Sequence, residues 1–280
     1  MSLLYSIDEL VEVTVVKRPS KHIKTPYVAD VLYNGKEYLA HTPSLGCCGL
    51  ADAGATILVA QSVNKTSKCD FTTYLSKTSD KEHPEYQTYV GIHPKLAENL
   101  AEQALKQNLL HRLQNVQSYR RETSIQVPEH DLHSRFDFSG IDQDGTPFLM
   151  EIKNVPLADY EDITAKERKT KNYKDRPYTS KVAYFPDGYR KKANDPVSPR
   201  ALKHIRELTK IRQISKTRTI LMFVVQRDDA TSFTTSILDE QYKQAVKEAT
   251  EKGVEIFVLA VQWNKDGKAH FITDQLSMDL

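Results

Sequence analysis

The sequence predicts a two-domain protein in which a small β-barrel is followed by a mixed β-sheet flanked by helices, an α+β and α/β combination. Three observations lead to this prediction. The first 80 residues or so contain five short apolar runs separated by turn residues. The remainder alternates strand-like and helix-like patterns, as in a sheet covered by helices. Residues 80–93 between them include a stretch without an apolar period. We therefore assign residues 1–85 to the barrel and residues 86–280 to the second domain.

The strands of the first domain are expected over residues 10–16, 27–32, 37–41, 56–63 and 71–75. Asn34 and Gly35 separate the second run from the third, and this dipeptide is a strong signal for a tight hairpin. Five short strands in so few residues suggest a small barrel, of which the OB-fold is one candidate. Barrels of that type commonly bind oligonucleotides, which adds a modest expectation of nucleic-acid binding.

The second domain is expected to contain three helices and five strands. The helices are predicted over residues 94–110, from Pro199, and over 240–251, and the strands over 116–127, 135–141, 147–155, 219–226 and 254–261. The segment 159–181 is polar, basic and rich in Lys, Thr and Tyr. We expect it to be a basic insertion that forms a surface loop or a disordered segment rather than part of the core.

The composition indicates a soluble intracellular protein. The 280 residues are 39% hydrophobic and 27% charged, with a mean hydropathy of −0.54. No 18-residue uncharged apolar run is present, and the first residues include acids where a secretory signal would be basic and then apolar. Cys47, Cys48 and Cys69 are odd in number and lack metal-ligand spacing, so we expect ordinary thiols in a reducing interior. The expected location is the cytoplasm, the nucleus or the nucleoid; secretion and membrane association are not expected.

The small net charge of +2 hides a basic segment. Residues 166–206 contain 13 Lys and Arg against 4 acidic residues, a local balance of +9. A polyanion such as nucleic acid is the expected partner of such a segment, and Lys191 and Lys192 are candidate contacts. A solvated flexible loop is the alternative, and for the charge run alone it is the better explanation.

Asp137, Glu151 and Lys153 form the most informative pattern. Glu151 and Lys153 project to one side of a predicted strand because side chains alternate, and Asp137 lies on the preceding strand. Two converging carboxylates can hold Mg²⁺ or Mn²⁺, and a lysine beside them can stabilise charge on a scissile phosphate or activate water. Glu122 could bind a second metal or orient the water of the first. The pattern alone is weak, because exposed strands often alternate acids and lysines.

The strand context supports the pattern. Arg135 and Asp137 should share one strand face, with Phe136 and Phe138 on the other. Arg135 is then a candidate nucleic-acid contact.

The helix from Pro199 adds further candidates. Ser198 is its expected cap, and Ala201, Ile205 and Leu208 form its apolar face. His204 falls on the edge of that face, where it is either a structural residue or a group that contacts phosphate or transfers a proton. Lys203, Arg206 and Glu207 should face away. Lys203 and Arg206 are expected to be solvated, with contacts to backbone phosphates as the functional alternative.

Several stretches resemble the sugar fermentation stimulation protein A family. They are Ser-Arg-Phe-Asp-Phe at 134–138, Glu-Ile-Lys-Asn-Val-Pro-Leu at 151–157, Phe-Pro-Asp at 185–187, Lys-His-Ile-Arg-Glu-Leu at 203–208 and Phe-Val-Val-Gln-Arg at 223–227. The resemblance implies an OB-like domain followed by a restriction-endonuclease-like, PD-(D/E)xK domain, in a family described as DNA-binding. It implies that Glu122, Asp137, Glu151 and Lys153 form the nuclease-type core, with His204 on the following helix and a less defined role for Asp187. The chain departs from the family pattern at residues 41–48 and 92–94.

The leading functional prediction is a nuclease that uses Mg²⁺ or Mn²⁺ to hydrolyse phosphodiester bonds in DNA, with RNA as the less favoured substrate. Its catalytic residues would be Lys153, Glu122 and His204, and its metal ligands Asp137 and Glu151. The alternative is a DNA-binding regulatory protein whose nuclease-like domain is catalytically silent. A third interpretation assigns the insertion and the altered first domain to protein interactions. No membrane partner is expected, and the oligomeric state stays open, a homodimer included.

Overall fold

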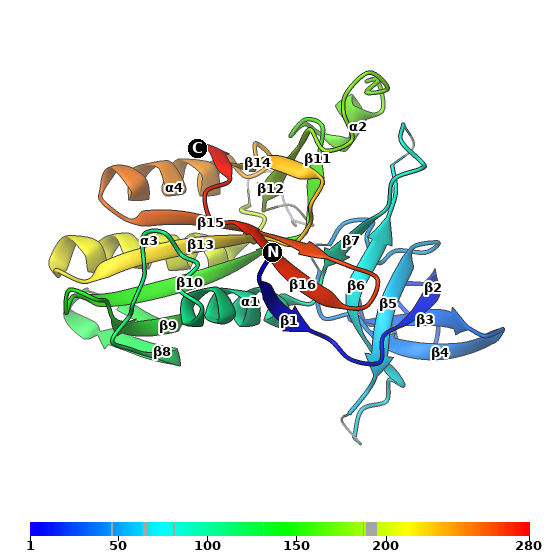
Figure 1. Cartoon of the computed structure of the whole chain (residues 1–280), viewed down its shortest axis with the longest axis horizontal. Coiled ribbons are helices and arrows are strands. Elements are labelled where there is room, and N and C mark those ends of the chain that lie inside the picture. The colour runs from blue at the N-terminus through cyan, green and yellow to red at the C-terminus, as the bar shows by residue number, and fades with distance from the viewer. Residues whose placement is uncertain (46, 64–65, 81, 131, 187, 189–194) are drawn as a thin grey trace.

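The computed structural model describes residues 1–45, 47–63, 66–80, 82–130, 132–186, 188 and 195–280. One long β-sheet runs through the molecule, and its two ends differ in character (Figure 1). At one end the strands curl around a small core of their own. At the other end they lie between helices. No helix among the described residues is both long enough and apolar enough to cross a membrane.

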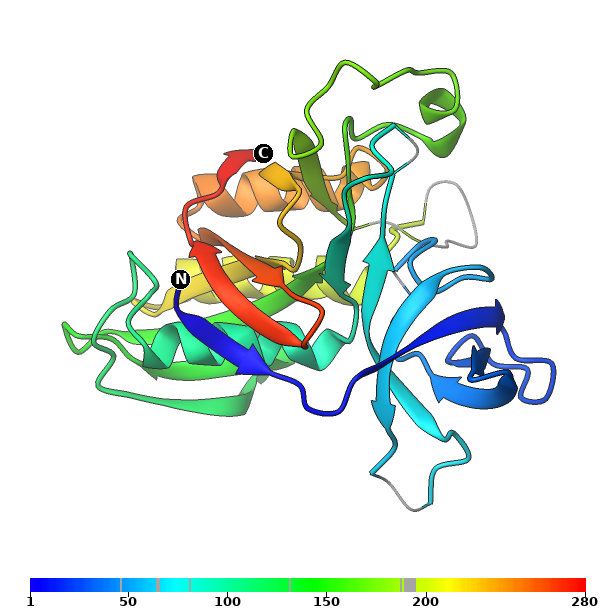
Figure 2. The ribbon, with the colours of Figure 1, turned by 45° about the vertical axis from the view of Figure 1, so that its right-hand side comes forward.

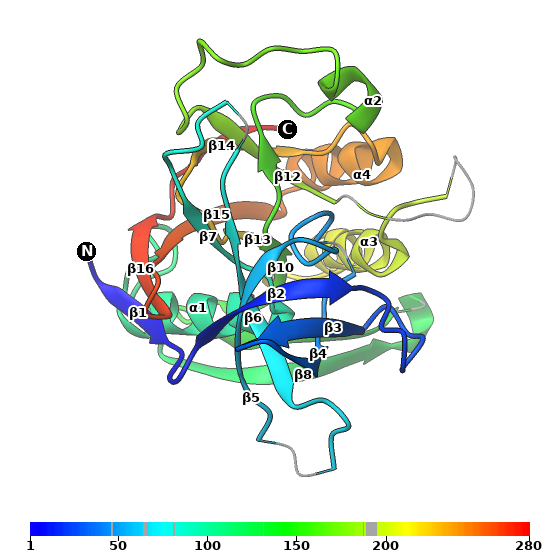
Figure 3. The same cartoon turned by 90° about the vertical axis from the view of Figure 1, so that its right-hand side faces the viewer.

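The curled end consists of five strands, here called the strand ring. They are β2 (Val11–Lys17), β3 (Val28–Tyr33), β4 (Lys36–His41), β5 (Thr56–Gln61) and β6 (Phe71–Thr78). They pair in the order β4-β3-β2-β5-β6, and β4 also pairs with β6, which closes the circuit (Figure 3). The predicted hairpin is confirmed, because Asn34 and Gly35 join β3 to β4 with positive φ angles of 48° and 76°.

The second end is here called the α/β part. Its sheet strands are β7 (Thr88–Gly91), β8 (Ser118–Val127), β9 (Leu132–Ile141), β10 (Pro147–Val155), β13 (Arg218–Val225) and β15 (Glu255–Trp263). Its longer helices are α1 (Pro94–Lys106), α3 (Pro199–Ile214) and α4 (Glu240–Glu251), and the short 3₁₀ helix η1 (Pro128–His130) joins β8 to β9. The order continues from the strand ring as β6-β7-β15-β13-β10-β9-β8. The mixed α/β architecture is therefore confirmed, and β7 is shared between the hydrogen-bonding ladders of the two ends.

Helices cover both faces of the α/β sheet. On one face α1 packs against alternate residues such as Met150 and Met222. On the other face α3 and α4 pack against the intervening residues, such as Leu149 and Phe223. A strand that is buried on both sides reads as a continuous apolar run, which explains why β13 is apolar from Ile220 onward.

Several short elements were not predicted. They are β1 (Leu3–Ser6), which lies beside β16 (Lys268–Thr273), and a separate small sheet of β11 (Ala158–Asp159), β12 (Lys181–Phe185), β14 (Ala230–Thr235) and β17 (Ser277–Asp279). Figure 2 shows β1 alongside β16 before the chain crosses to the strand ring. Each of these strands has two to six residues, and most show no clear alternation of buried and exposed positions, so the sequence carries little signal for them.

The prediction for the basic insertion was partly wrong. The segment contains the short helix α2 (Ala165–Arg168), and three of its tyrosines, Tyr160, Tyr173 and Tyr178, are buried. Tyr160 and Tyr173 stack with ring centroids 4.9 Å apart. Lys181 is also buried, with its Nζ 3.8 Å from the centroid of the Tyr178 ring. Part of the basic segment is therefore internal, because the Lys181 ammonium lies over tyrosine rings and pairs with Asp80 and Asp229.

Candidate active site

Glu151 and Lys153 lie on the face of β10 that packs under α3. Both are buried, and Glu151 Oε1 accepts hydrogen bonds from Lys153 Nζ at 2.5 Å and from His204 Nδ1. Glu151 Oε2 is buried and has no hydrogen-bond partner among the described residues. Burial opposes ionisation of this carboxyl, but Lys153 and His204 outweigh it and lower its pKa. The result is an ionised, buried carboxylate with one unused oxygen.

Asp137 stands where β9 and β10 separate. The last paired residues of the two strands are Phe138 and Met150, and Asp137 Oδ2 then accepts a 2.7 Å hydrogen bond from the backbone N–H of Ile152. A side-chain carboxylate thus takes the place of a backbone carbonyl. Phe136 packs under α3 whereas Phe138 packs against α1, so the expectation that they share a face was wrong. The interrupted ladder lets the strand turn over between them.

The two carboxyl groups influence each other. Burial raises the pKa of Asp137, the negative charge of Glu151 raises it further, and the Ile152 N–H and Lys153 only partly offset these effects, giving a pKa of about 7. This coupling indicates that the two side chains lie close to each other.

Glu122 lies opposite Asp137 on β8. The flanking pairs are Arg121 with Phe138 and Thr123 with Phe136, so Glu122 occupies the position between them. Its φ of 55° places it in the left-handed region, and its exposed side chain contacts Lys95 at 3.5 Å and Arg135 at 3.6 Å. The structure brings Glu122 to the edge of the site, where two cations hold its carboxylate.

Helix α3 carries His204 into the site. Ser198 caps the helix by accepting from the Ala201 N–H, Pro199 begins it, and His204 is buried with its ring 6.0 Å from that of Phe136. Glu207 was expected to face away, which is wrong. It is buried and accepts hydrogen bonds from the His133 N–H and the Ser134 hydroxyl. These bonds tie α3 to β9.

The predicted nucleic-acid contacts do not all lie together. Arg135 and Lys203 are exposed and line a hollow of about 450 Å³ that also reaches His204, between β8, β9 and the start of α3. Arg206 instead lines a groove between α3 and α4. Two residues along a helix turn by about 200°, which places Arg206 nearly opposite His204. Lys191, Lys192 and Asp187 lie outside the described residues.

The carboxylates fit a divalent metal. Among the described residues, no three His, Cys, Asp or Glu side chains converge as a complete ligand set. Mg²⁺ does not need such a set, because it usually keeps several waters and uses one or two carboxylates together with substrate phosphate. Glu151 Oε2, a buried oxygen that lacks a partner, and the adjoining Asp137 provide this kind of partial set.

Helix α1 also contributes to the site, which its sequence pattern alone does not reveal. Lys95 forms ion pairs with both Glu98 and Glu122. Glu98 also forms an ion pair with Arg121 at 2.8 Å, and its negative charge raises the pKa of Asp137. The available signal was the His93-Pro94 pair, which caps and starts α1. That pair fixes the helix start beside the site, but it does not reveal which strand the helix faces.

Comparisons with known proteins agree on one family. A family model described as the sugar fermentation stimulation protein RE domain matches residues 95–166 and 167–267. A sugar fermentation stimulation protein homolog of Trichodesmium erythraeum is 30% identical, with 82% of this chain and 78% of the relative aligned. A homolog of Alteromonas mediterranea is 27% identical, with 87% of each chain aligned.

A solved structure has the same fold. The structure of Pyrococcus furiosus SfsA in complex with Ca²⁺ superposes with a TM-score of 0.74 over the whole of both chains, at 18% identity. The extent of the family match, the curated relatives and this shared fold lead to one conclusion. The chain belongs to the sugar fermentation stimulation protein, or SfsA, family.

Proposed function

We propose that this protein is a nuclease that uses Mg²⁺ or Mn²⁺ to hydrolyse phosphodiester bonds in DNA. The observation that carries the proposal is the unused Oε2 of Glu151, a buried ionised carboxylate beside Asp137. A purely structural cluster would be expected to satisfy such an oxygen, since an unpaired buried polar atom costs stability. The Pyrococcus furiosus relative, whose structure is described as a complex with Ca²⁺, supports a divalent cation in this family.

Asp137 and Glu151 would hold the ion. A bound divalent ion supplies Lewis-acid stabilisation of the phosphate and lowers the pKa of a bound water. Lys153 and His204 keep Glu151 ionised and fix the direction of its unused oxygen. Lys153 also places a positive charge where negative charge develops on the phosphate. Glu122, released from Lys95 and Arg135, is the proposed acceptor that orients the attacking water.

Two further features favour a nucleic-acid substrate. Arg135 and Lys203 are exposed at the hollow that reaches His204, so they can contact phosphates on either side of the scissile one. The strand ring pairs its five strands in a closed circuit, which supports the proposal that it is an OB-like barrel, a fold that commonly binds oligonucleotides. We therefore assign DNA as substrate and the strand ring as an OB-like binding module.

The test is cleavage by purified protein. Labelled single-stranded and double-stranded DNA and RNA are incubated with Mg²⁺, Mn²⁺ or EDTA, and the wild type is compared with Asp137→Ala and Lys153→Ala. We expect metal-dependent cleavage of DNA by the wild type and its loss in both variants. Equal cleavage by the wild type and Asp137→Ala would sink the assignment. Metal-independent DNA binding without cleavage would instead support the non-catalytic DNA-binding alternative.

A further inference from the structure

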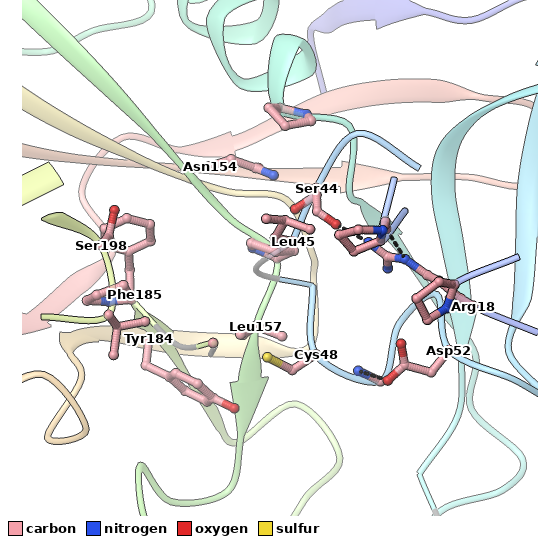
Figure 4. A pocket seen from close by; sticks show the side chains of 18 residues that line it. Arg18, Ser44, Leu45, Cys48, Asp52, Asn154, Leu157, Tyr184, Phe185 and Ser198 are labelled. Atoms are coloured by element: carbon pink, nitrogen blue, oxygen red, sulfur yellow. Dashed lines mark hydrogen bonds between the residues drawn. The ribbon is translucent and has the colours of Figure 1, made fainter. Parts of the chain in front are cut away.

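We propose that a pocket between the strand ring and the α/β part receives an unpaired nucleobase of the substrate strand, with Asn154 as its hydrogen-bond donor. The inference deepens the proposed function, because it names the form of nucleic acid that the site accepts. The pocket, here called the inter-domain pocket, has a volume of about 770 Å³ (Figure 4). Leu45 and Cys48 line it from the strand-ring side, and Leu157, Tyr184 and Phe185 line it from the α/β part.

A chain of hydrogen bonds fixes the direction of the Asn154 amide. The indole Nε1–H of Trp263 can only donate, and it donates to Gln226 Oε1 at 3.0 Å. This identifies the other end of the Gln226 side chain as the NH₂ group, which donates to Asn154 Oδ1 at 2.5 Å. The oxygen of the Asn154 amide is thus used by Gln226, and its NH₂ group is the part that can donate a hydrogen bond into the pocket. In Figure 4 this nitrogen points toward the side of Ser44 and Leu45.

The support for this amide is rigid. Gln226 and Trp263 are both buried, and Gly91 packs so closely against them that a Cβ there would lie 1.9 Å from Gln226 Oε1. The backbone of Gln226 also forms hydrogen bonds with two strands: its carbonyl accepts from the Gly91 N–H of β7, and its N–H donates to the Val155 carbonyl of β10. A half-buried amide held in one orientation is a specific donor, which suits recognition of an acceptor on a base edge.

The walls of the pocket suit a base better than a phosphate. The two charged side chains that line it have partners: Arg18 donates to the backbone carbonyls of Pro26 and Ser44, and Asp52 accepts from the Gly49 N–H. The other walls are largely apolar or aromatic, as in sites that stack or enclose uncharged rings.

The pocket also adjoins the candidate active site. Asn154 directly follows Lys153 at the carboxyl end of β10, and Ser198, the cap of the helix that carries His204, lines the same pocket. The side chains of Lys153 and Asn154 project to opposite faces of β10, so a nucleic-acid strand that passes around the end of β10 can place one phosphate on the Lys153 face and an adjacent base on the Asn154 face. A paired base cannot enter, so this geometry favours single-stranded or locally unpaired substrate.

Binding in EDTA tests the pocket separately from catalysis. Fluorescence anisotropy is measured with a labelled 12-nucleotide oligothymidine, an abasic strand of the same length and a matched duplex. The variants are Leu45→Ala and Asn154→Asp, where aspartate still accepts from Gln226 but presents no donor. Val63→Ala is the control, since Val63 is 96% exposed and does not line the pocket. Circular dichroism checks that each variant is folded.

We expect Leu45→Ala and Asn154→Asp to weaken oligothymidine binding about tenfold. Binding of the abasic strand and of the duplex should change less than twofold, and Val63→Ala should change nothing. Equal losses for the abasic strand would show that charge, and not base recognition, explains the Asn154→Asp result, and would overturn the proposal. Unchanged oligothymidine binding in both variants, or none by the wild type, would also overturn it.

A second measurement locates the bound base. Cys48 is exposed at the pocket, whereas Cys47 and Cys69 are buried, so a maleimide should react first at Cys48. Oligothymidine should slow this reaction several-fold, and the abasic strand should not. Equal protection by both strands would contradict base entry. Neither assay requires turnover, so a protein that binds in this way but fails to cleave would refute the proposed nuclease and leave the pocket intact.

Discussion

Two buried clusters in this molecule each contain a lysine and a carboxylate, and they differ in how completely the carboxylate is bonded. In the first, Asp229 uses both oxygens: Arg227 donates to each of them, and Lys181 donates to Oδ2 at 2.8 Å. In the second, Glu151 uses one oxygen for Lys153 and His204 and leaves the other without a partner. The first cluster is complete and supports the fold. The second is incomplete, as expected of a site that binds something else.

The pKa values of the carboxyl groups also distinguish the two clusters. Burial acts against ionisation of Asp229, but Arg227 and Lys181 lower its pKa to about 2. Asp137, beside Glu151, has a pKa raised to about 7. One carboxyl is fixed in a single charge state at physiological pH, whereas the other titrates there. Perturbed carboxyls of the second kind mark functional sites more often than structural ones.

Removing the carboxylate of the complete cluster should have the largest effect on stability. Asp229→Ala leaves Arg227 buried without its carboxylate partner and leaves Lys181 paired with Asp80 alone, which should lower the free energy of unfolding by about 3–5 kcal/mol. Urea denaturation followed by circular dichroism measures the change. Metal-dependent cleavage by the remaining folded protein at low temperature should stay near the wild-type rate, and a loss of cleavage without destabilisation would reverse the roles of the two clusters.

Changing the incomplete cluster should affect activity more than stability. Glu151→Gln keeps the shape of the side chain but removes the charge that holds a divalent ion, so cleavage should fall about 10²–10³-fold. Single-turnover rates at saturating Mn²⁺ measure the loss. Asp229→Asn is the matched control, because it also neutralises a buried carboxylate. Comparable loss of cleavage in both variants, at equal folded fractions, would contradict the comparison.

The titration of Asp137 predicts opposite effects on stability and activity. Its folded pKa of about 7 lies above the ordinary 3.8, so the folded chain binds more protons between these values and loses stability as the pH rises through that window. Asp137→Asn should therefore stabilise the metal-free protein at pH 8 by about 1–3 kcal/mol and have little effect at pH 4. Thermal unfolding in EDTA at both values is the measurement.

Cleavage activity should increase with pH as Asp137 ionises, whereas stability decreases. A carboxyl must be ionised to hold a divalent ion. Wild-type cleavage at limiting Mg²⁺ should therefore rise between pH 6 and 8, and saturating Mn²⁺ should move the midpoint to lower pH. A flat profile would remove Asp137 from the metal site.

The smallest effect is expected for a substitution of Lys203, which belongs to neither cluster. Lys203 is exposed and donates to the His133 carbonyl beside the hollow that reaches His204. Lys203→Ala should weaken DNA binding a few-fold and reduce the slope of log affinity against log salt by about 1. Arg206→Ala, in the groove between α3 and α4, should change neither quantity. Equal effects of the two substitutions would show that this contact surface is wider than proposed.

The sequence was sufficient for the elements that carry a clear period. The predicted limits of β10 and α4 coincide with those observed, and most other predicted helices and strands differ by a few residues at one end or both. Strand alternation also placed Glu151 and Lys153 on one face. Patterns of this kind depend only on local geometry and burial, which a single sequence records.

The remaining features depend on contacts between distant segments. The turn of β9 between Phe136 and Phe138 coincides with the Asp137 bond to Ile152 and with the positive φ of Glu122 on β8, which no local pattern encodes. Glu207 looked solvated on a helical wheel, but it is buried because Ser134 and His133 of β9 supply its donors. Tyr160 and Tyr178 of the basic insertion likewise pack on His83, which lies far away in the sequence.

The continuous sheet has a mechanical consequence. Because β7 pairs with β6 on one side and reaches β15 on the other, the strand ring cannot swing away from the α/β part without breaking backbone hydrogen bonds. The shared sheet therefore restricts movement of the strand ring relative to the α/β part. The sheet therefore also limits changes in the width of the inter-domain pocket. Polymers would be selected by whether they fit the existing opening, and not by closure of the strand ring over the α/β part.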